Sequence, residues 1–167
     1  MAGAPPKLLA LDTNLVLDLA EDLDSAHDFR ETFKSRGYGF RLPSTAAMEL
    51  SWKARNDPAH RVRALATRAL AGLRKWDIQP LSELGDLDFA IAKQFVSRLQ
   101  YARLLPDEEM NDGLILAETS LAQIPALVTS DAHLLDIDET DLRLVFEECD
   151  LPGVTPVHPQ KMLKALR

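Results

Sequence analysis

Cysteine is nearly absent from the sequence, because Cys149 is the only one among 167 residues. One cysteine cannot form an intrachain disulfide and cannot supply the clustered thiolates of a zinc site. No apolar run approaches the roughly 20 residues that cross a bilayer. The first apolar run, Leu8 to Leu11, ends at Asp12 and is too short for a secretory signal. These absences favour a cytoplasmic protein with no membrane partner.

Low-complexity and repeated segments are also missing, and 46% of the residues are hydrophobic, so we expect a single domain over residues 1–167. Apolar runs predict strands at residues 8–11, 38–42, 126–129 and 154–157, whereas residues 78–81 fit either a short strand or an extended link. Helices are expected after residue 14, around Glu49, and at residues 24–36, 59–75, 87–104, 111–123 and 159–166. This alternation predicts an α/β fold, a three-layer sandwich with a central, mainly parallel sheet flanked by helices.

Positive charge is scarce overall, since 19 lysines and arginines face 26 acids and the net charge is −7. This balance argues mildly against a nucleic-acid binder, which usually carries a positive face. The charges are unevenly distributed, however. Residues 53–75 hold seven basic residues and one acid, whereas acids dominate residues 131–150. Each stretch is either a solvated helix face or a contact surface.

Two of the predicted strands are followed closely by an acid. Asp12 comes directly after the strand at residues 8–11, and Asp131 follows the strand at residues 126–129. Ligands of open parallel sheets bind beyond the carboxyl ends of the strands. If the two strands are neighbours, both carboxylates therefore lie at one mouth of the sheet. The alternative is that these acids only cap the helices that follow them.

Two further acids lie on predicted helices. Asp112 is on the apolar face of the helix at residues 111–123, where a carboxylate is costly unless it is paired or bound to a metal. Glu49 is in a helix whose expected cap is Ser44 or Thr45, and it too is expected to face inward. The alternatives are a favourable interaction of Asp112 with the helix dipole and an ordinary solvated Glu49.

Four carboxylates without a cysteine or histidine cluster suit a hard cation such as Mg²⁺ or Mn²⁺. Two such ions, about 3.5–4 Å apart, can stabilise the attacking and leaving oxygens of a phosphodiester displacement. Bound cations also invert the local charge, which would allow an acidic protein to act on RNA. The acids therefore indicate a metal-dependent hydrolase.

Taken together, these residues resemble a PIN-domain ribonuclease. The resemblance covers most of the chain and rests on four ordered motifs: the first strand with Asp12-Thr13-Asn14, Glu49 within residues 43–50, Asp112 at the head of an apolar helix, and Asp131 within residues 127–135. It implies a central parallel sheet flanked by helices and an Mg²⁺- or Mn²⁺-dependent endoribonuclease. It also implies that the catalytic, metal-binding acids are Asp12, Glu49, Asp112 and Asp131.

By the same resemblance, Asn14 and Ser130 become supporting or water-positioning residues. Many small stand-alone members of the family are VapC-type toxins, which cut RNA, are blocked by a cognate antitoxin and commonly dimerise. The resemblance therefore implies an RNA substrate, with an antitoxin protein and a homodimer as candidate partners. We further predict that the basic helix contacts RNA phosphates through Arg61, Arg63 and Arg68.

Other polar residues near these motifs are given structural roles. A metal-bound hydroxide makes a histidine base unnecessary, so His133 is expected to be structural. The neighbouring acids could add a metal ligand, but solvation is expected for them: Asp107, Glu108, Glu109, Asp136 and Asp138. Of the last two, Asp136 is the more plausible auxiliary ligand.

Three rival interpretations stay open. A HAD-type phosphohydrolase also begins with a strand and an Asp, but it needs a second acid two residues later, where this sequence has Asn14. A PIN-like fold without turnover would be a non-catalytic binding module. Finally, the acids could only cap helices, and then a divalent ion would not change the melting temperature.

Overall fold

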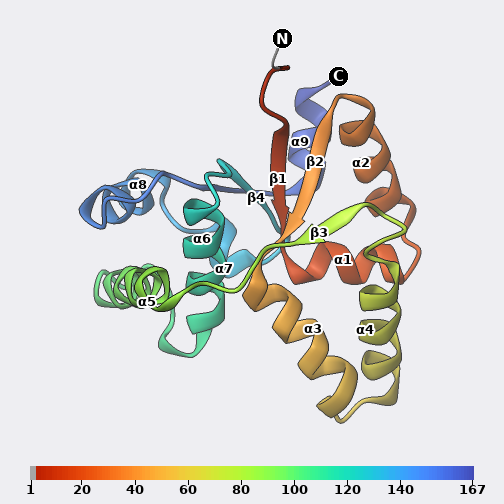
Figure 1. The fold of residues 1–167 in the computed structure, drawn as a ribbon, viewed down its shortest axis with the longest axis horizontal. Helices are drawn as coiled ribbons and strands as arrows, with labels where there is room; N and C mark the ends of the chain where they lie inside the picture. The colour runs from red at the N-terminus through yellow and green to blue at the C-terminus, as the bar shows by residue number, and fades with distance from the viewer. Residues whose placement is uncertain (1–2) are drawn as a thin grey trace.

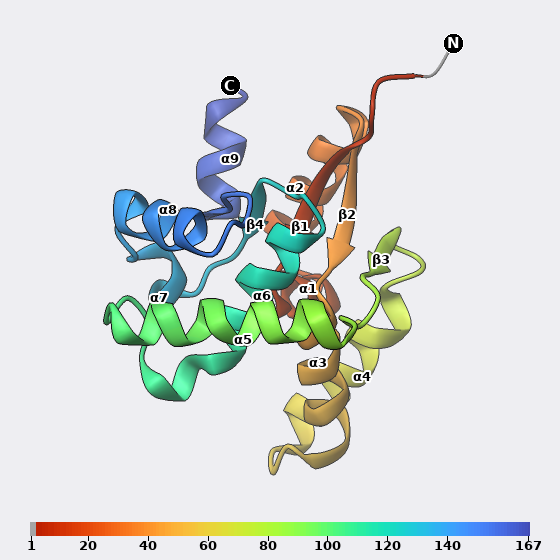
Figure 2. The same ribbon diagram turned by 60° about the vertical axis from the view of Figure 1, so that its left-hand side comes forward.

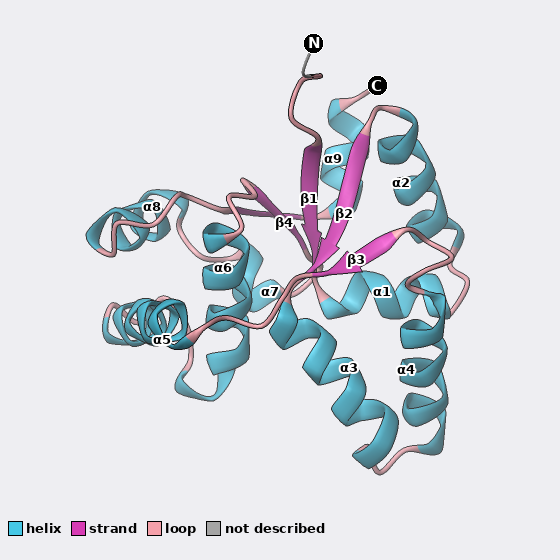
Figure 3. Cartoon of the chain, viewed as in Figure 1, coloured by secondary structure: helices cyan, strands magenta, loops and turns pink. Residues whose placement is uncertain are grey.

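A single five-stranded sheet forms the centre of the computed structural model, which describes residues 3–167 (Figures 1 and 3). All of its paired strands are parallel, and their order is β3-β2-β1-β4-β5. The strands are β1 (Lys7–Leu11), β2 (Tyr38–Leu42), β3 (Ile78–Pro80), β4 (Ala126–Val128) and β5 (Thr155–Val157). The first strand of the sequence is therefore the central strand of the sheet.

Helices cover both faces of this sheet. Figure 1 shows α2 and α9 on one side and α5, α6 and α8 on the other, and Figure 2 shows α5 lying outside α6. Below the carboxyl ends of the strands lie α3 and α4. The bounds are α1 (Thr13–Ala20), α2 (Asp24–Ser35), α3 (Ser44–Asn56), α4 (His60–Gly72), α5 (Asp86–Tyr101), the 3₁₀ turn η1 (Asp107–Glu109), α6 (Met110–Leu121), α7 (Ala132–Leu135), α8 (Glu139–Glu148) and α9 (Pro159–Ala165). The predicted sandwich of helices around a parallel sheet is confirmed.

The core explains why β1 and α6 carry such apolar sequences. Residues 9–11 of β1 are almost fully buried because the strand has neighbours on both edges and helices on both faces. In α6, every residue from Asp112 to Ser120 is buried, since the helix packs between the sheet and α5. No helix in residues 3–167 combines the length and hydrophobicity that a membrane span requires.

Some local predictions differ from the structure. No helix was expected at residues 139–148, where α8 forms and buries Leu142, Val145 and Phe146. The amphipathic pattern of residues 87–104 also places Phe89 on the apolar face of its helix, but its side chain is 46% exposed near the start of α5. In both cases exposed acids and helix ends obscure the apolar periodicity.

Candidate metal centre

Asp12 joins the carboxyl end of β1 to its neighbour β4. Its backbone N–H donates to the carbonyl of Val128 at 2.9 Å. Its Oδ1 accepts the backbone N–H of Thr13 at 2.7 Å, and its Oδ2 accepts the hydroxyl of Thr129 at 2.7 Å. The side chain is only 3% exposed, so these bonds fix the carboxylate beneath the surface of the site.

Asp131 occupies the corresponding place after β4. Its backbone N–H donates to the Thr129 hydroxyl at 3.0 Å, and its Oδ1 accepts the N–H of His133 at 2.9 Å as the cap of α7. Because β1 and β4 are adjacent, the structure places Asp12 and Asp131 at one edge of the sheet. Both acids do cap helices, as one alternative expected, but they also share the hydroxyl of Thr129.

Glu49 reaches this edge from α3. Its Oε2 accepts the hydroxyl of Thr13 at 2.8 Å, so the residue after Asp12 links α3 to the start of α1. The start of α3 is held by another helix: both carboxylate oxygens of Glu118 in α6 accept the N–H of Thr45, at 2.9 and 3.0 Å. The expected cap, Ser44 or Thr45, is therefore wrong. Pro43 precedes the helix and offers no side-chain hydrogen bond, so Glu118 takes that role.

Asp112 lies in the first turn of α6, and its side chain is only 7% exposed. Within residues 3–167, its Oδ2 atom is buried and has no hydrogen-bond partner. An unpartnered buried carboxylate oxygen is costly, and a cation is the ligand that would satisfy it best. This oxygen is the strongest indication that the acids surround a ligand site.

The electrostatics agree with that interpretation. Burial, together with the nearby charges of Glu49 and Asp131, raises the pKa of Asp12 to about 6, although hydrogen bonds from Thr129 and Thr13 oppose this shift. Burial raises the pKa of Asp112 to about 8, together with the charges of Asp131, Asp12 and Glu109. Acids that raise each other's pKa form a region of negative potential, which a divalent cation would relieve.

Glu109 and His133 complete the cluster, although Glu109 was expected to be a solvated loop acid. The Nδ1 atom of His133 lies 3.2 Å from Oε1 of Glu109. One ligand atom each from Glu109, Asp112 and His133 lie within 4.8 Å of one another, a spacing that suits a metal ion. Asp107, Glu108, Asp136 and Asp138 are exposed, as expected.

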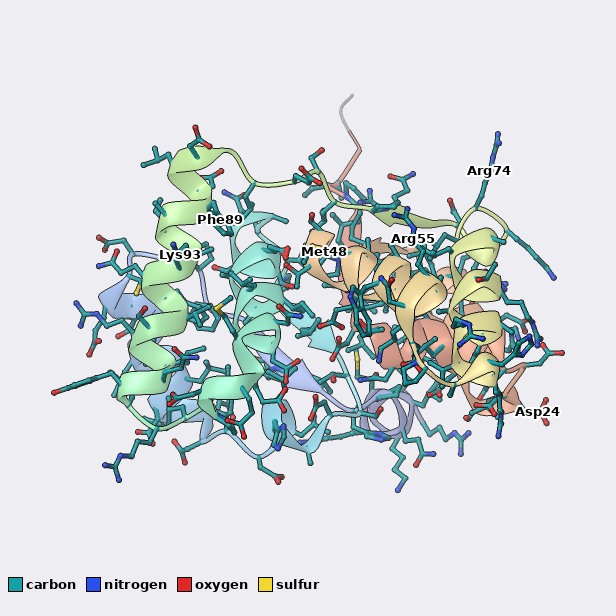
Figure 4. All side chains as sticks on the ribbon, turned by 90° about the horizontal axis from the view of Figure 1, so that it is seen from below. Asp24, Met48, Arg55, Arg74, Phe89 and Lys93 are labelled. Carbon is teal, nitrogen blue, oxygen red and sulfur yellow. The ribbon has the colours of Figure 1, made fainter. Side chains whose placement is uncertain are left out.

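A surface cavity opens above the acids, between α3 and α6. Its acidic wall consists of Glu49, Glu109, Asp112 and Asp131. Its other wall includes Met48, Trp52 and Lys53 of α3. Figure 4 looks toward the carboxyl ends of the strands and shows α3 beside α6, with Met48 between them.

The predicted supporting residues lie beside the acids. The amide nitrogen of Asn14 lies 3.3 Å from Oδ2 of Asp12 and 3.3 Å from Oγ1 of Thr129. Its Oδ1 accepts the backbone N–H of Ser130 at 3.1 Å. Asn14 therefore links the loops after β1 and β4, whereas Ser130 takes part through its backbone and its side chain is exposed.

The three arginines predicted to contact RNA are not brought to the acids. In Figure 4, α4 lies on the far side of α3 from α6, and it contributes no lining residue to the acidic cavity in residues 3–167. Arg61 forms an ion pair with Glu21, and Arg63 donates to the carbonyl of Asp57 at 2.7 Å. Arg68 is exposed. Their contact with RNA stays a prediction.

Three residues that hydrogen-bond at the site or hold α3 in place were not identified from the sequence: Thr13, Thr129 and Glu118. The position of Thr129 in the sequence could have indicated its role, because its hydroxyl group lies between a buried strand and Asp131 and can form hydrogen bonds there. The position of Glu118 could have done so too, because an acid within an apolar helix needs a partner, as Asp112 does. Its partner Thr45 is 73 residues away in the sequence and could not be identified from it.

The sequence matches no protein-family model and no curated protein at a significant level. The fold does match solved structures. A chain of VapBC2 from Rickettsia felis, bound to a DNA fragment from their promoter, matches with a TM-score of 0.62 at 14% identity, over 90% of this chain and 98% of that chain. FitAcB from Neisseria gonorrhoeae matches with a TM-score of 0.56 at 16% identity, over 91% and 98% of the two chains.

A third structure, FitAB bound to an IR36 DNA fragment, matches with a TM-score of 0.54 at 16% identity, over 90% of this chain and 94% of that one. At such low identity these matches establish the fold. The chain has the PIN-like α/β fold that the sequence motifs implied.

Proposed function

We propose that this PIN-like chain is a metal-dependent endoribonuclease, with residues 1–167 forming one nuclease domain. The observation that carries the proposal is the buried, unpartnered Oδ2 atom of Asp112 among other acids. The position of the cluster supports it further, because ligands of parallel α/β sheets bind at the carboxyl edge of the strands.

The donor set fits Mg²⁺ or Mn²⁺, because the site presents mainly carboxylate oxygens. Glu49, Asp112 and Asp131 line the cavity and would hold the ion, with Asp12 beneath them and Glu109 and His133 at the side. When bound, such an ion supplies positive charge to the reacting phosphate and lowers the pKa of a water ligand. Thr129, Thr13 and Asn14 orient the carboxylates through their hydrogen bonds.

The test is cleavage of a folded RNA mixture with Mg²⁺, with Mn²⁺ and with EDTA, by the wild-type protein and by Asp12→Asn in parallel. Metal-dependent cleavage that disappears in Asp12→Asn is the expected result. Asp24→Asn is the matched control, because Asp24 is an exposed acid of the first turn of α2 that lies far from the cavity (Figure 4).

Binding of the ion is measured separately from turnover. A ligand that binds only the folded state raises the melting temperature by mass action. Mg²⁺ or Mn²⁺ should therefore stabilise the wild-type protein more than Asp12→Asn. Stabilisation without cleavage of any RNA would instead indicate a non-catalytic binding module. Cleavage that survives Asp12→Asn would place the active site elsewhere.

The likeness to VapBC2 and FitAcB supports a role as the toxin of a toxin–antitoxin pair, with a homodimer as the candidate assembly. Expression of the wild-type chain should then arrest growth of a bacterial host, whereas Asp12→Asn should not. Co-expression of the product of a neighbouring gene should restore growth. Equal growth with both forms would contradict the toxin role but not the nuclease activity.

A further inference from the structure

One wall of the acidic cavity is apolar and exposed. Met48 and Trp52 are 57% and 56% exposed, and both line the cavity, so they form an exposed apolar patch beside the acids. They are four residues apart in α3 and therefore share one helix face. The other tryptophan, Trp76, is only 6% exposed and lies outside this cavity.

Trp52 is close to the acids by helix geometry. Glu49 precedes it by three residues, and side chains at that spacing are neighbours, with Cβ atoms about 5–6 Å apart. The same cavity continues from the indole to Asp112 and Asp131. A molecule whose reactive group meets the acids can therefore also contact the indole.

Lys53 adds a positive charge to the same cavity. Its side chain lines the wall beside Trp52, and among residues 3–167 it forms no ion pair. An aromatic face and an ammonium group together match the two parts of a nucleotide. The base can stack on the indole, and the ammonium can contact a phosphate.

We propose that Trp52 stacks against an unpaired base beside the phosphate held at the acids, and that Lys53 contacts a phosphate of the same strand. The inference rests on the proposed nuclease function and specifies its substrate as an unpaired segment of RNA. A base inside a duplex offers no free ring face, because both faces are stacked on neighbouring bases. A protein partner fits this wall less well than RNA does. The wall consists of two apolar side chains among charged groups, whereas a stable protein contact buries about 800 Å² per partner.

The first experiment uses tryptophan fluorescence. Asp12→Asn, which we expect to retain RNA binding and to lose cleavage, is titrated in Mg²⁺ with a mixed-sequence RNA strand of 12 nucleotides and with the same strand in a duplex. The single strand should quench the exposed tryptophan, and the duplex should not. The quenching should disappear in Asp12→Asn/Trp52→Phe, since the remaining tryptophan, Trp76, is buried.

The second experiment measures affinity and kinetics. Trp52→Ala should bind the single strand roughly 5- to 150-fold more weakly, which corresponds to about 1–3 kcal/mol per stacked base. The weakening should appear mainly in KM, because stacking also stabilises the bound ground state. Phe89→Ala is the matched control: Phe89 is exposed, has the Lys93 ammonium 5.7 Å from its ring, and lies on α5 outside the acidic cavity (Figure 4).

The outcomes separate the two proposals. If RNA binds without quenching the fluorescence, and Trp52→Ala binds it as tightly as the wild-type protein, the stacking proposal is overturned. The proposed nuclease function is not affected by that result. A change in sedimentation of Trp52→Ala, with KM and kcat unchanged, would identify the wall as a protein contact and also overturn it. If the wild-type protein neither binds nor cleaves RNA, the proposed function fails, and the inference fails with it.

Discussion

The acidic site and the basic helix α4 carry opposite charges, and they also differ in burial and in hydrogen bonding. The acids come from several elements, two are almost fully buried, and hydrogen bonds fix them in place. The arginines of α4 lie on one helix at the surface, where Arg61 has a local ion pair and Arg63 contacts nearby carbonyls. Burying like charges together is expensive, whereas exposing basic side chains costs little. A buried cluster of like charges is therefore a better indicator of a functional site than an exposed stretch of basic residues.

The largest expected effect follows from removing the charge of Asp112. Asp112→Asn should lower RNA cleavage at least about 100-fold, because a bound metal contributes several kcal/mol to transition-state stabilisation. Asp107→Asn, at an exposed acid of the preceding turn, should cleave normally. Single-turnover cleavage rates in Mg²⁺ measure the difference. Equal rates for Asp112→Asn and wild type would remove Asp112 from the site.

The second prediction concerns pH in the absence of metal. The folded-state pKa is about 6 for Asp12 and about 8 for Asp112, both above the usual 3.8, so protonation of these groups favours the folded state. Their contribution is complete below about pH 4 and declines as pH rises through these values. Between pH 6 and 8, the free energy of unfolding in EDTA should fall by about 1–3 kcal/mol.

Urea titrations at several pH values test this expectation. Asp112→Asn should remove most of the decrease and be more stable than wild type at pH 8, since it lacks the buried charge. Mg²⁺ should restore much of the stability of the wild-type protein at that pH. A flat profile for wild type in EDTA would show that burial and mutual repulsion do not raise the pKa values of these acids in the folded state.

A smaller effect is expected at the contact between α6 and α3. Glu118→Ala removes the acceptor of the Thr45 N–H and should lower the free energy of unfolding by about 1–2 kcal/mol. Glu118→Gln retains one acceptor oxygen and should recover much of that stability. Because α3 carries Glu49, Mg²⁺ should also stabilise Glu118→Ala less than Glu118→Gln. Equal Mg²⁺ stabilisation of both variants would limit Glu118 to a role in folding.

The smallest effect is expected from replacing the arginines of α4. Replacing Arg61, Arg63 and Arg68 with Ala should weaken RNA binding and reduce its salt dependence, by about one in the logarithmic slope for each phosphate that is no longer neutralised. Titrations of Asp12→Asn and its triple-arginine derivative at several salt concentrations provide the measurement. Unchanged affinity and slope would show that α4 is an ordinary solvated face.

Local patterns predicted most of this fold, because buried strands and amphipathic helices leave periodic signals. The strands predicted at residues 8–11 and 126–129 correspond to β1 and β4, and the acids that follow them were identified from the same pattern. Pairing between distant residues leaves no such signal. The contact of Glu118 with Thr45 and that of Glu109 with His133 depend on how helices and loops dock, which a single sequence does not specify.

The strand order also has a consequence for the timing of synthesis. β1 is synthesised first and pairs with β2 along one edge, but the strand that pairs with its other edge, β4, is synthesised much later. A nascent chain that ends at Tyr101 contains Asp12 and Glu49 but lacks both Asp112 and Asp131. The proposed cleaving site therefore cannot assemble on an early translation intermediate. On the proposed function, an incomplete chain would therefore not cleave the RNA around the ribosome that makes it.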